Sequence, residues 1–188
     1  MEKMEQAKVS LRGIRPIMFD RYAGDNDTQL QTEEKMYYAP DKKTVVIPSQ
    51  NILGMLGSNF FDCATKRKYG RARETKTNAV QGFLDITPMK VPLLRDGKPA
   101  VFTEFGKDGF YIDESTARIK KSANQFVPNF KVRPVLDLPW SLDFDLELFP
   151  NSEITMKDVM DLFAIGGLYV GLGTWRGRYG KCVIDKWN

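Results

Sequence analysis

The sequence predicts an α+β protein with the element order β-α-β-β-α-β, which is the ferredoxin-like (RRM-like) fold, with inserted β-hairpins. Apolar residues alternate with polar ones at residues 8–12 and 141–148, as in strands that bury one face. They recur at helical spacing at residues 50–65 and 155–168. An apolar segment at residues 181–187 supplies a last strand. In this fold the helices cover one face of an antiparallel sheet and leave the other face free.

The elements of the first half follow from local signals. After the first strand, EEKMYYAPDKKTVVIP predicts a β-hairpin with PDKK at its turn. Ser49 is expected to cap a single helix over residues 50–65, whose buried apolar stripe includes Phe60 and Cys63. The segments AVQGFLDIT and VPLL then predict strands, because β-branched and aromatic residues favour extended backbone.

The second half is assigned in the same way. Turn signals RDGK and GKDG predict one or two exposed hairpins between about residues 90 and 125. FKVRPVL and WSLDFDLELF return to strand. Thr155 and Asp158 match a capping box that starts a second helix, running to about Leu168. We expect one domain, residues 1–188, with a basic hairpin or loop excursion at about 66–133.

Composition narrows the class of function. The 188 residues include no histidine and two cysteines, which removes Ser-His-Asp and Cys-His catalysis and nearly every zinc site. No GxxxxGK[ST] or GxGxxG loop is present. No apolar run reaches the roughly 20 residues of a membrane span, and the N-terminus lacks the apolar segment of a signal peptide. We therefore expect a cytoplasmic protein without a cofactor, and a non-enzyme is favoured.

The charge is concentrated in the middle of the chain. Residues 66–133 hold fifteen cations and seven anions, a net +8, although the whole protein carries only +4. Such an asymmetry favours a surface that faces a polyanion. A solvated surface without a ligand is the alternative.

The densest basic segment is KRKYGRARETK, at residues 66–76. Phosphate backbones attract several point charges, and a tyrosine ring can stack on a base. The alternative is pairing of cations with a helix C-terminus. The predicted nucleic-acid contacts from the basic excursion are Lys66, Arg67, Lys68, Tyr69, Arg71, Arg73, Lys76, Lys120 and Lys121.

A second candidate segment is GLGTWRGRYGK, after the second helix. Residues 166–180 hold six of the fifteen glycines, which favours close approach of the backbone to another group. Arg176 and Arg178 are predicted to hold phosphates, with Tyr179 stacking or bracing them. Trp175 is expected to pack inside. A purely structural turn is the alternative.

Carboxylates offer weaker candidates. Asp20, Asp25 and Asp27 lie in a loop where they could gather Mg²⁺, so they are the only weak candidates for catalysis. Loops are also rich in Asp for turn geometry, which is the favoured interpretation. Asp143, Asp145 and Glu147 could hold a metal on one strand face, but a solvated face is the favoured interpretation.

The motifs resemble those of the RAMP superfamily, which includes the subunits that coat guide RNA in class 1 CRISPR complexes and small stand-alone phage relatives. The family's IP-(S/A)-x-x-ϕ-x-G-x-L motif, where ϕ is apolar, and its GxGxWR-x-x-x-G motif are both matched. The matching residues are Ile47, Pro48, Ser49, Ile52, Gly54, Leu56, Gly171, Gly173, Trp175, Arg176 and Gly180. The resemblance covers both ends of the chain but not its middle, and the short length favours the stand-alone relatives.

The resemblance implies binding of single-stranded nucleic acid and head-to-tail assembly along the strand. Some family members cut RNA with an Asp in the loop after the first strand, a position open here to Asp20, Asp25 or Asp27. The resulting hypothesis is sequence-tolerant binding of RNA or single-stranded DNA. The alternatives are a metal-dependent ribonuclease and a phage inhibitory or structural protein that binds a protein partner.

Overall fold

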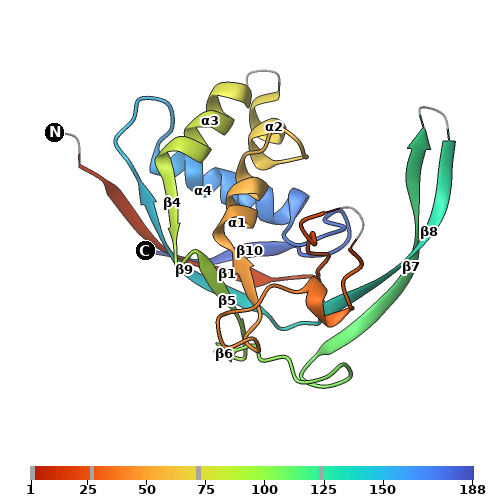
Figure 1. Cartoon of the computed structure of the whole chain (residues 1–188). Helices are drawn as coiled ribbons and strands as arrows, with labels where there is room; N and C mark the ends of the chain where they lie inside the picture. Colours follow the sequence, from red (N-terminus) through yellow and green to blue (C-terminus); the bar gives the residue numbers. More distant parts are fainter. Residues whose placement is uncertain (1–2, 26–27, 71–72, 123–124) are drawn as a thin grey trace.

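The computed structural model describes residues 3–25, 28–70, 73–122 and 125–188. The strands form two sheets, and the helices pack against the larger one (Figure 1). The strands are β1 (Glu5–Gly13), β2 (Ile17–Met18), β3 (Val46–Pro48), β4 (Leu84–Thr87), β5 (Lys90–Arg95), β6 (Lys98–Pro99), β7 (Phe110–Ser122), β8 (Gln125–Leu136), β9 (Ser141–Leu148) and β10 (Cys182–Trp187). The helices are η1 (Glu33–Lys35), α1 (Ser49–Leu56), α2 (Ala64–Tyr69), α3 (Arg73–Phe83), α4 (Met156–Ile165) and the π-helical η3 (Gly166–Val170).

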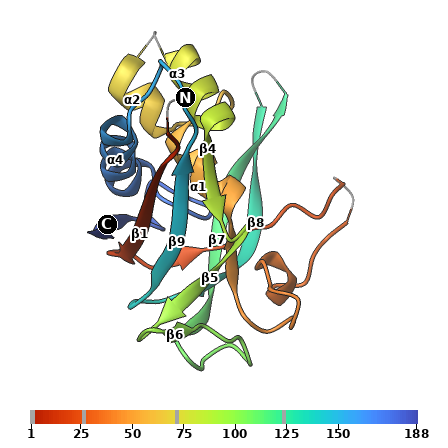
Figure 2. The same cartoon turned by 90° about the vertical axis from the view of Figure 1, so that its left-hand side faces the viewer.

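The central sheet has the ferredoxin-like topology. Its order is β10-β1-β9-β5-β3, with β4 also paired to β9, and every pairing in it is antiparallel. The strands β1, β4, β9 and β10 are the four core strands of a β-α-β-β-α-β chain, placed in the order fourth, first, third, second. Helices α1 to α4 lie on one side of this sheet (Figure 2). The predicted fold class is confirmed.

The core forms where the sheet meets the helices. In β9 the apolar side chains at positions 142, 144, 146 and 148 are buried, whereas Asp143 and Asp145 are exposed. Strand geometry explains the pattern, because successive side chains point to opposite faces. From the helical side, Phe163 of α4 packs against Phe144 with ring centroids 5.8 Å apart. Burial of such rings contributes roughly 1.5–3 kcal/mol each.

The helical segment after β3 differs from the prediction of one helix over residues 50–65. Helix α1 ends at Leu56, because Gly57 is extended, with φ −145° and ψ 120°. A Cβ on Gly57 would lie 3.3 Å from the Cα of Thr77, so the glycine lets α3 approach closely. The chain becomes helical again only at α2, and Phe60 lies in the connection rather than on a buried stripe.

Residues 79–83 were predicted as part of a strand but form the last turns of α3. Ala79 and Val80 are buried there, and Val80 packs against Gly57, the residue that follows α1. Apolar residues in a short run fit a buried helix face as well as a strand, so packing decided the structure. The strand begins only at Leu84.

The second sheet is a long hairpin that leaves the core. Strands β7 and β8 pair over their length, and the short β2 extends them into a three-stranded sheet. Figure 1 shows the hairpin projecting away from the central sheet and the helices. The predicted hairpins between about residues 90 and 125 are confirmed in part: RDGK turns β5 into β6, whereas GKDG only precedes β7 and the long hairpin extends to Leu136.

The second helix begins as the sequence predicts. The Thr155 hydroxyl accepts from the Asp158 backbone N–H at 3.2 Å, and the Thr155 backbone N–H donates to the Asp158 carboxylate at 3.1 Å. Hydrogen bonds from Thr155 lower the pKa of Asp158 to about 2. The helix continues as η3 to Val170, and β10 closes the chain. Among the described residues, no helix combines the length and apolar character that crossing a bilayer requires.

Candidate nucleic-acid interface

The glycine-rich loop, residues 171–180, is anchored to β2 and to the residues just before it. The Thr174 N–H donates to the Met18 carbonyl at 2.8 Å, and the Gly180 N–H donates to the Pro16 carbonyl at 2.7 Å. A Cβ at Gly173 would collide with the Met18 carbonyl, and φ at Gly173 is +75°. These glycines therefore serve close approach between two parts of the same chain. Gly177, at the tip of the loop, faces open space.

Exposed aromatic rings lie beside cations on one side of this loop. Phe60 is 90% exposed and Phe61 is 62% exposed. The Arg176 guanidinium lies 5.4 Å from the Phe61 ring centroid, and the Arg67 guanidinium lies 5.9 Å from that of Tyr169. We call the set Phe60, Phe61, Arg67, Tyr169 and Arg176 the aromatic–cation surface. The connection between α1 and α2, the helix α2, η3 and the loop all contribute to it.

The cations of this surface are partly shielded from water. Burial lowers the pKa of Arg176, although the guanidinium keeps its charge at any physiological pH. Arg67 forms an ion pair with Asp62. Placing cations over aromatic faces contributes about 0.5–1 kcal/mol at exposed sites. The pairs hold the rings and the charges together on one surface.

A cationic cavity adjoins the aromatic–cation surface. It has a volume of about 490 Å³, and Arg15, Leu168, Arg178 and Lys181 are among its lining residues. The pKa of Lys181 is lowered overall. Burial is the main cause and the nearby charge of Arg67 adds to it, and the opposing effects of Asp62 and Cys182 are smaller. Three cations around one cavity form a local excess of positive charge that favours an anionic ligand.

The loop does not present Arg176 and Arg178 on one side. The chain turns at Trp175, whose carbonyl accepts from the Arg178 N–H at 3.0 Å. Arg176 consequently lies over Phe61, and Arg178 lines the adjoining cavity. Both predicted arginines lie in this region, in a turn instead of the extended segment that would align them.

The Trp175 side chain is not packed inside, contrary to the prediction. It is 44% exposed and stacks on Tyr179 with ring centroids 6.3 Å apart. Its backbone has φ +50°, a left-handed conformation that favours glycine. The buried tryptophan is Trp140, whose indole N–H donates to the Arg15 carbonyl at 2.8 Å. Trp140 fills the space over Gly13, where a Cβ would collide with its ring.

Three of the predicted contacts in the basic segment instead join α2 and α3 to the start of α4. The Lys68 ammonium binds Asp161 at 2.8 Å and Asp158 at 3.4 Å. The Tyr69 hydroxyl donates to Asp158 at 3.1 Å. Lys76 donates to the Glu153 carbonyl. Lys66 is exposed. Of this group, Arg67 lies in the aromatic–cation surface.

The side chains of four further predicted contacts lie outside what the structure describes. Arg71 lies outside the described residues, and the side chains of Arg73, Lys120 and Lys121 also lie outside what the structure describes. The backbone places Arg73 at the start of α3 and the two lysines near the end of β7. The two lysines are thus far along the hairpin from its base at Phe110.

A polar cluster joins the other side of the glycine-rich loop to the base of the hairpin. The Arg133 Nε donates to the Asp20 carboxylate at 2.8 Å, and the Arg133 guanidinium lies 5.8 Å from the Trp175 ring. The Tyr179 hydroxyl donates to Asp113 at 3.0 Å. Burial raises the pKa of Tyr179, and the hydrogen bond to Asp113 raises it further. The loop is therefore fastened to the hairpin through side chains.

This cluster also accounts for the first of the three candidate catalytic carboxylates. Asp20 is paired with Arg133, whereas Asp25 accepts from the Thr28 N–H at 2.6 Å in a turn. Asp27 lies outside the described residues. Within the part of the chain that the structure describes, no three Cys, Asp or Glu side chains gather closely enough to hold a metal ion.

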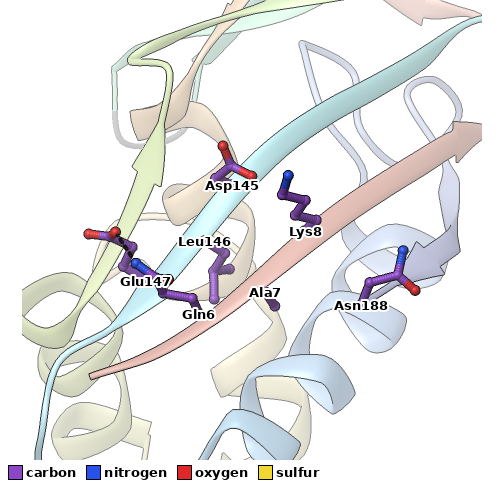
Figure 3. A pocket seen from close by; sticks show the side chains of 7 residues that line it. All are labelled: Gln6, Ala7, Lys8, Asp145, Leu146, Glu147 and Asn188. Atoms are coloured by element: carbon purple, nitrogen blue, oxygen red, sulfur yellow. Dashed lines mark hydrogen bonds between the residues drawn. The ribbon is translucent and has the colours of Figure 1, made fainter. Parts of the chain in front are cut away.

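The open face of the central sheet is polar. Figure 3 shows a cavity of about 490 Å³ there, with Lys8 and Gln6 of β1 beside Asp145 and Glu147 of β9. The Gln6 amide donates to Glu147 at 2.8 Å. The outward side chains of β1 and β9 include none of the aromatic residues on which an RNA-recognition motif stacks bases. Exposed rings paired with cations lie instead around the glycine-rich loop, where Arg176 covers Phe61 and Arg67 covers Tyr169.

Sequence reasoning missed Phe61, Tyr169 and Arg133 as members of these sites. The one available signal was the Phe60–Phe61 pair in the sequence GSNFF, since a helix that breaks at Gly57 leaves both rings outside it. Nothing local marks Arg133, because its partners Asp20 and Trp175 come from two distant segments.

Comparison with known proteins supports the fold. No family model and no curated protein matches the sequence. A solved structure that does match is a chain of the type III-B Cmr-beta bound to cognate target RNA, determined by cryo-EM, with a TM-score of 0.61 and 15% sequence identity. The match covers 99% of this chain and 60% of that chain. The protein therefore shares the fold of the Cmr-beta chain and spans about 60% of its length.

Proposed function

We propose that this protein binds single-stranded nucleic acid, RNA in the first place, with little dependence on sequence. The aromatic–cation surface is the observation that carries the proposal. Exposed rings accept any base by stacking, which contributes about 1–3 kcal/mol per base, and adjacent cations neutralise phosphates. Phe60 and Phe61 supply exposed rings, Arg176 lies over the Phe61 ring, and Arg67 lies over the Tyr169 ring of the same surface.

A solvated surface would not explain the exposed rings. Large apolar side chains normally lose exposure on folding because burial stabilises the protein, and a cluster of exposed ones marks an interaction site. The cationic cavity lined by Arg178 and Lys181 continues the surface beyond the loop. A strand that stacks on the two phenylalanines could place its phosphates along these cations.

We further propose a RAMP-like relationship. It is supported by the two motifs at the helix start and the glycine-rich loop, and by the fold shared with a chain of an RNA-bound Cmr-beta complex. In the structure the motif Ile47–Pro48 leads from β3 into α1. Head-to-tail self-association along the strand, and membership among the stand-alone phage relatives, belong to the same proposal.

The nuclease alternative has less support in the geometry. Asp20 is bound to Arg133, so its carboxylate serves the hairpin base. A protein partner remains the second use of an exposed aromatic surface, and it is an outcome of the test below.

The test is binding of fluorescent 20-nucleotide RNA, followed by anisotropy at fixed salt. Phe60→Ala with Phe61→Ala should weaken binding by about tenfold or more, because each lost stack is worth about 1–3 kcal/mol. Arg176→Ala with Arg178→Ala should cost a similar amount, about 1–3 kcal/mol, through lost charged hydrogen bonds.

The matched control is Met89→Ala, which removes another apolar side chain, 80% exposed, on the turn between β4 and β5. It should bind as the parent does. Equal binding by the parent and both double variants would overturn the proposal, and absence of binding by the parent would leave the surface to a protein partner.

A further inference from the structure

Three buried polar atoms at the base of the hairpin have no hydrogen-bond partner among the described residues. They are Asp113 Oδ1, Ser115 Oγ and Arg133 Nη1. The Arg133 side chain is only 10% exposed. Buried polar groups in proteins are almost always hydrogen-bonded, because leaving one unpaired costs its full desolvation. Three such atoms in one place indicate a site that a ligand completes.

The three atoms lie on one face of the hairpin. Asp113 is directly opposite Arg133 in the register of β7 and β8, and Ser115 is opposite Lys131. Directly opposed residues point to the same face, with Cβ atoms about 4.5–5.5 Å apart, and residues two apart on a strand share that face as well. A small group on this face of the hairpin can therefore reach the Asp113 acceptor and the Arg133 donor together.

One other polar atom of each charged side chain already has a partner. Asp113 Oδ2 accepts from the Tyr179 hydroxyl at 3.0 Å, and Arg133 Nε donates to Asp20 at 2.8 Å. These bonds hold the carboxylate and the guanidinium in place. At this site Asp113 Oδ1 is then left as a hydrogen-bond acceptor and Arg133 Nη1 as a donor.

We propose that this site binds a ribose 2′-hydroxyl and so makes the protein prefer RNA to single-stranded DNA. A hydroxyl both donates and accepts, which matches Asp113 Oδ1 on one side and Arg133 Nη1 on the other, with Ser115 Oγ as a third partner. A guanine base is a less suitable ligand. Its two adjacent N–H groups would bind both carboxylate oxygens of Asp113, and Tyr179 already occupies one of those oxygens. The 2′-hydroxyl is also the group that distinguishes RNA from DNA. This inference rests on the proposed function.

The glycine-rich loop controls access to the site. The Trp175 ring lies beside the Arg133 guanidinium, so the ribose reaches the site when this ring shifts outward while Tyr179 keeps its hydrogen bond to Asp113. The left-handed backbone of Trp175 and the open space around Gly177 place the point of movement at the loop tip. Lys131, partly exposed on the same face, is placed to hold a neighbouring phosphate.

The experiment compares three 15-nucleotide strands of one sequence: RNA, DNA and fully 2′-O-methylated RNA. The parent should bind RNA about tenfold more tightly than DNA, and methylation should abolish that advantage because the hydroxyl can no longer donate to Asp113. Ser115→Ala and Asp113→Asn should each reduce the RNA-to-DNA affinity ratio at least threefold, by weakening RNA binding and leaving DNA binding unchanged.

The matched control is Thr116→Ala, which changes the neighbouring position on the opposite, exposed face of β7 and should keep the parent ratio. Thermal melting identifies any variant that is unfolded; Ser115→Ala, the smallest change, carries the test if Asp113→Asn fails to fold. Equal binding of RNA and DNA by the parent overturns this inference and leaves the proposed function intact. Loss of binding to all three strands overturns both.

Discussion

At the scale of single residues, the two tryptophans show how position determines the role of a side chain. Trp140 is 1% exposed and its ring covers Gly13. Trp175 is 44% exposed and lies between Tyr179 and Arg133 at the hairpin base. The first stabilises the fold, and the second is available to a ligand.

Replacement of each tryptophan by alanine should therefore affect a different property, stability for Trp140 and RNA binding for Trp175. Trp140→Ala should destabilise the protein by about 3–5 kcal/mol, as large-to-small changes in cores do. Trp175→Ala should change the free energy of unfolding by less than about 1.5 kcal/mol and weaken RNA binding instead. Urea denaturation and anisotropy measure the two quantities. A core-sized loss of stability in Trp175→Ala would show that its ring is structural after all.

At the scale of elements, α2 and α4 depend on one carboxylate. Asp158 closes the capping box of α4 and also accepts from Lys68 and Tyr69 of α2. Lys68 and Tyr69 were predicted to contact nucleic acid, and these contacts show that they join two helices. The pKa of Lys68 is raised by the hydrogen bonds to Asp161 and Asp158 against the effect of burial, which lowers it.

The pH dependence of stability should report this contact. The pKa of Asp158 is lowered from 3.8 to about 2 on folding, so its contribution is present above about pH 4 and is lost as the pH falls towards 2. Partial exposure reduces that contribution to about 1–2 kcal/mol. Asp158→Asn should remove it and flatten the stability curve between pH 4 and 2, as measured by urea denaturation.

The exposed Asp143 provides the control, since Asp143→Asn should leave the curve of the parent unchanged. A variant Asp158→Asn with the full acid dependence of the parent would assign that dependence to other carboxylates.

At the scale of the whole molecule, positive charge and exposed rings gather on one side of the glycine-rich loop, whereas the open sheet face carries acidic and basic side chains together. The basic excursion, at residues 66–133, has a net charge of +8 within a protein of +4. Such a concentration of positive charge favours the approach of a polyanion to the surface beside the loop.

Salt should weaken RNA binding steeply, because each phosphate contact releases condensed counterions from a single strand. The triple reversal Arg67→Glu, Arg71→Glu and Arg73→Glu should weaken binding further and reduce the slope of log K against log salt by up to about 2. Anisotropy titrations at several salt concentrations measure the slope.

A triple reversal on the open sheet face, at Lys8, Arg12 and Lys186, changes the net charge equally and is the control. It should alter the slope much less. Equal effects of the two triples would mean that net charge alone attracts the nucleic acid.

The sequence by itself determined the features that depend on neighbours along the chain. The alternation in β9, the capping box at Thr155 and the last strand β10 all formed as their patterns predict, because strand and helix periodicities are local. Together with the order of elements, they were sufficient for the ferredoxin-like fold class.

Only the tertiary structure decided which side chains meet. The approach of α3 to Gly57 ended α1 and left Phe60 in an exposed connection, and the long pairing of β7 with β8 brought Arg133 to Asp20 and Trp175. These contacts join residues 20 to more than 100 positions apart, and neither composition nor periodicity encodes such distances. The glycines of the loop were visible in the sequence, but their packing against Pro16 and Met18 follows from the folded chain alone.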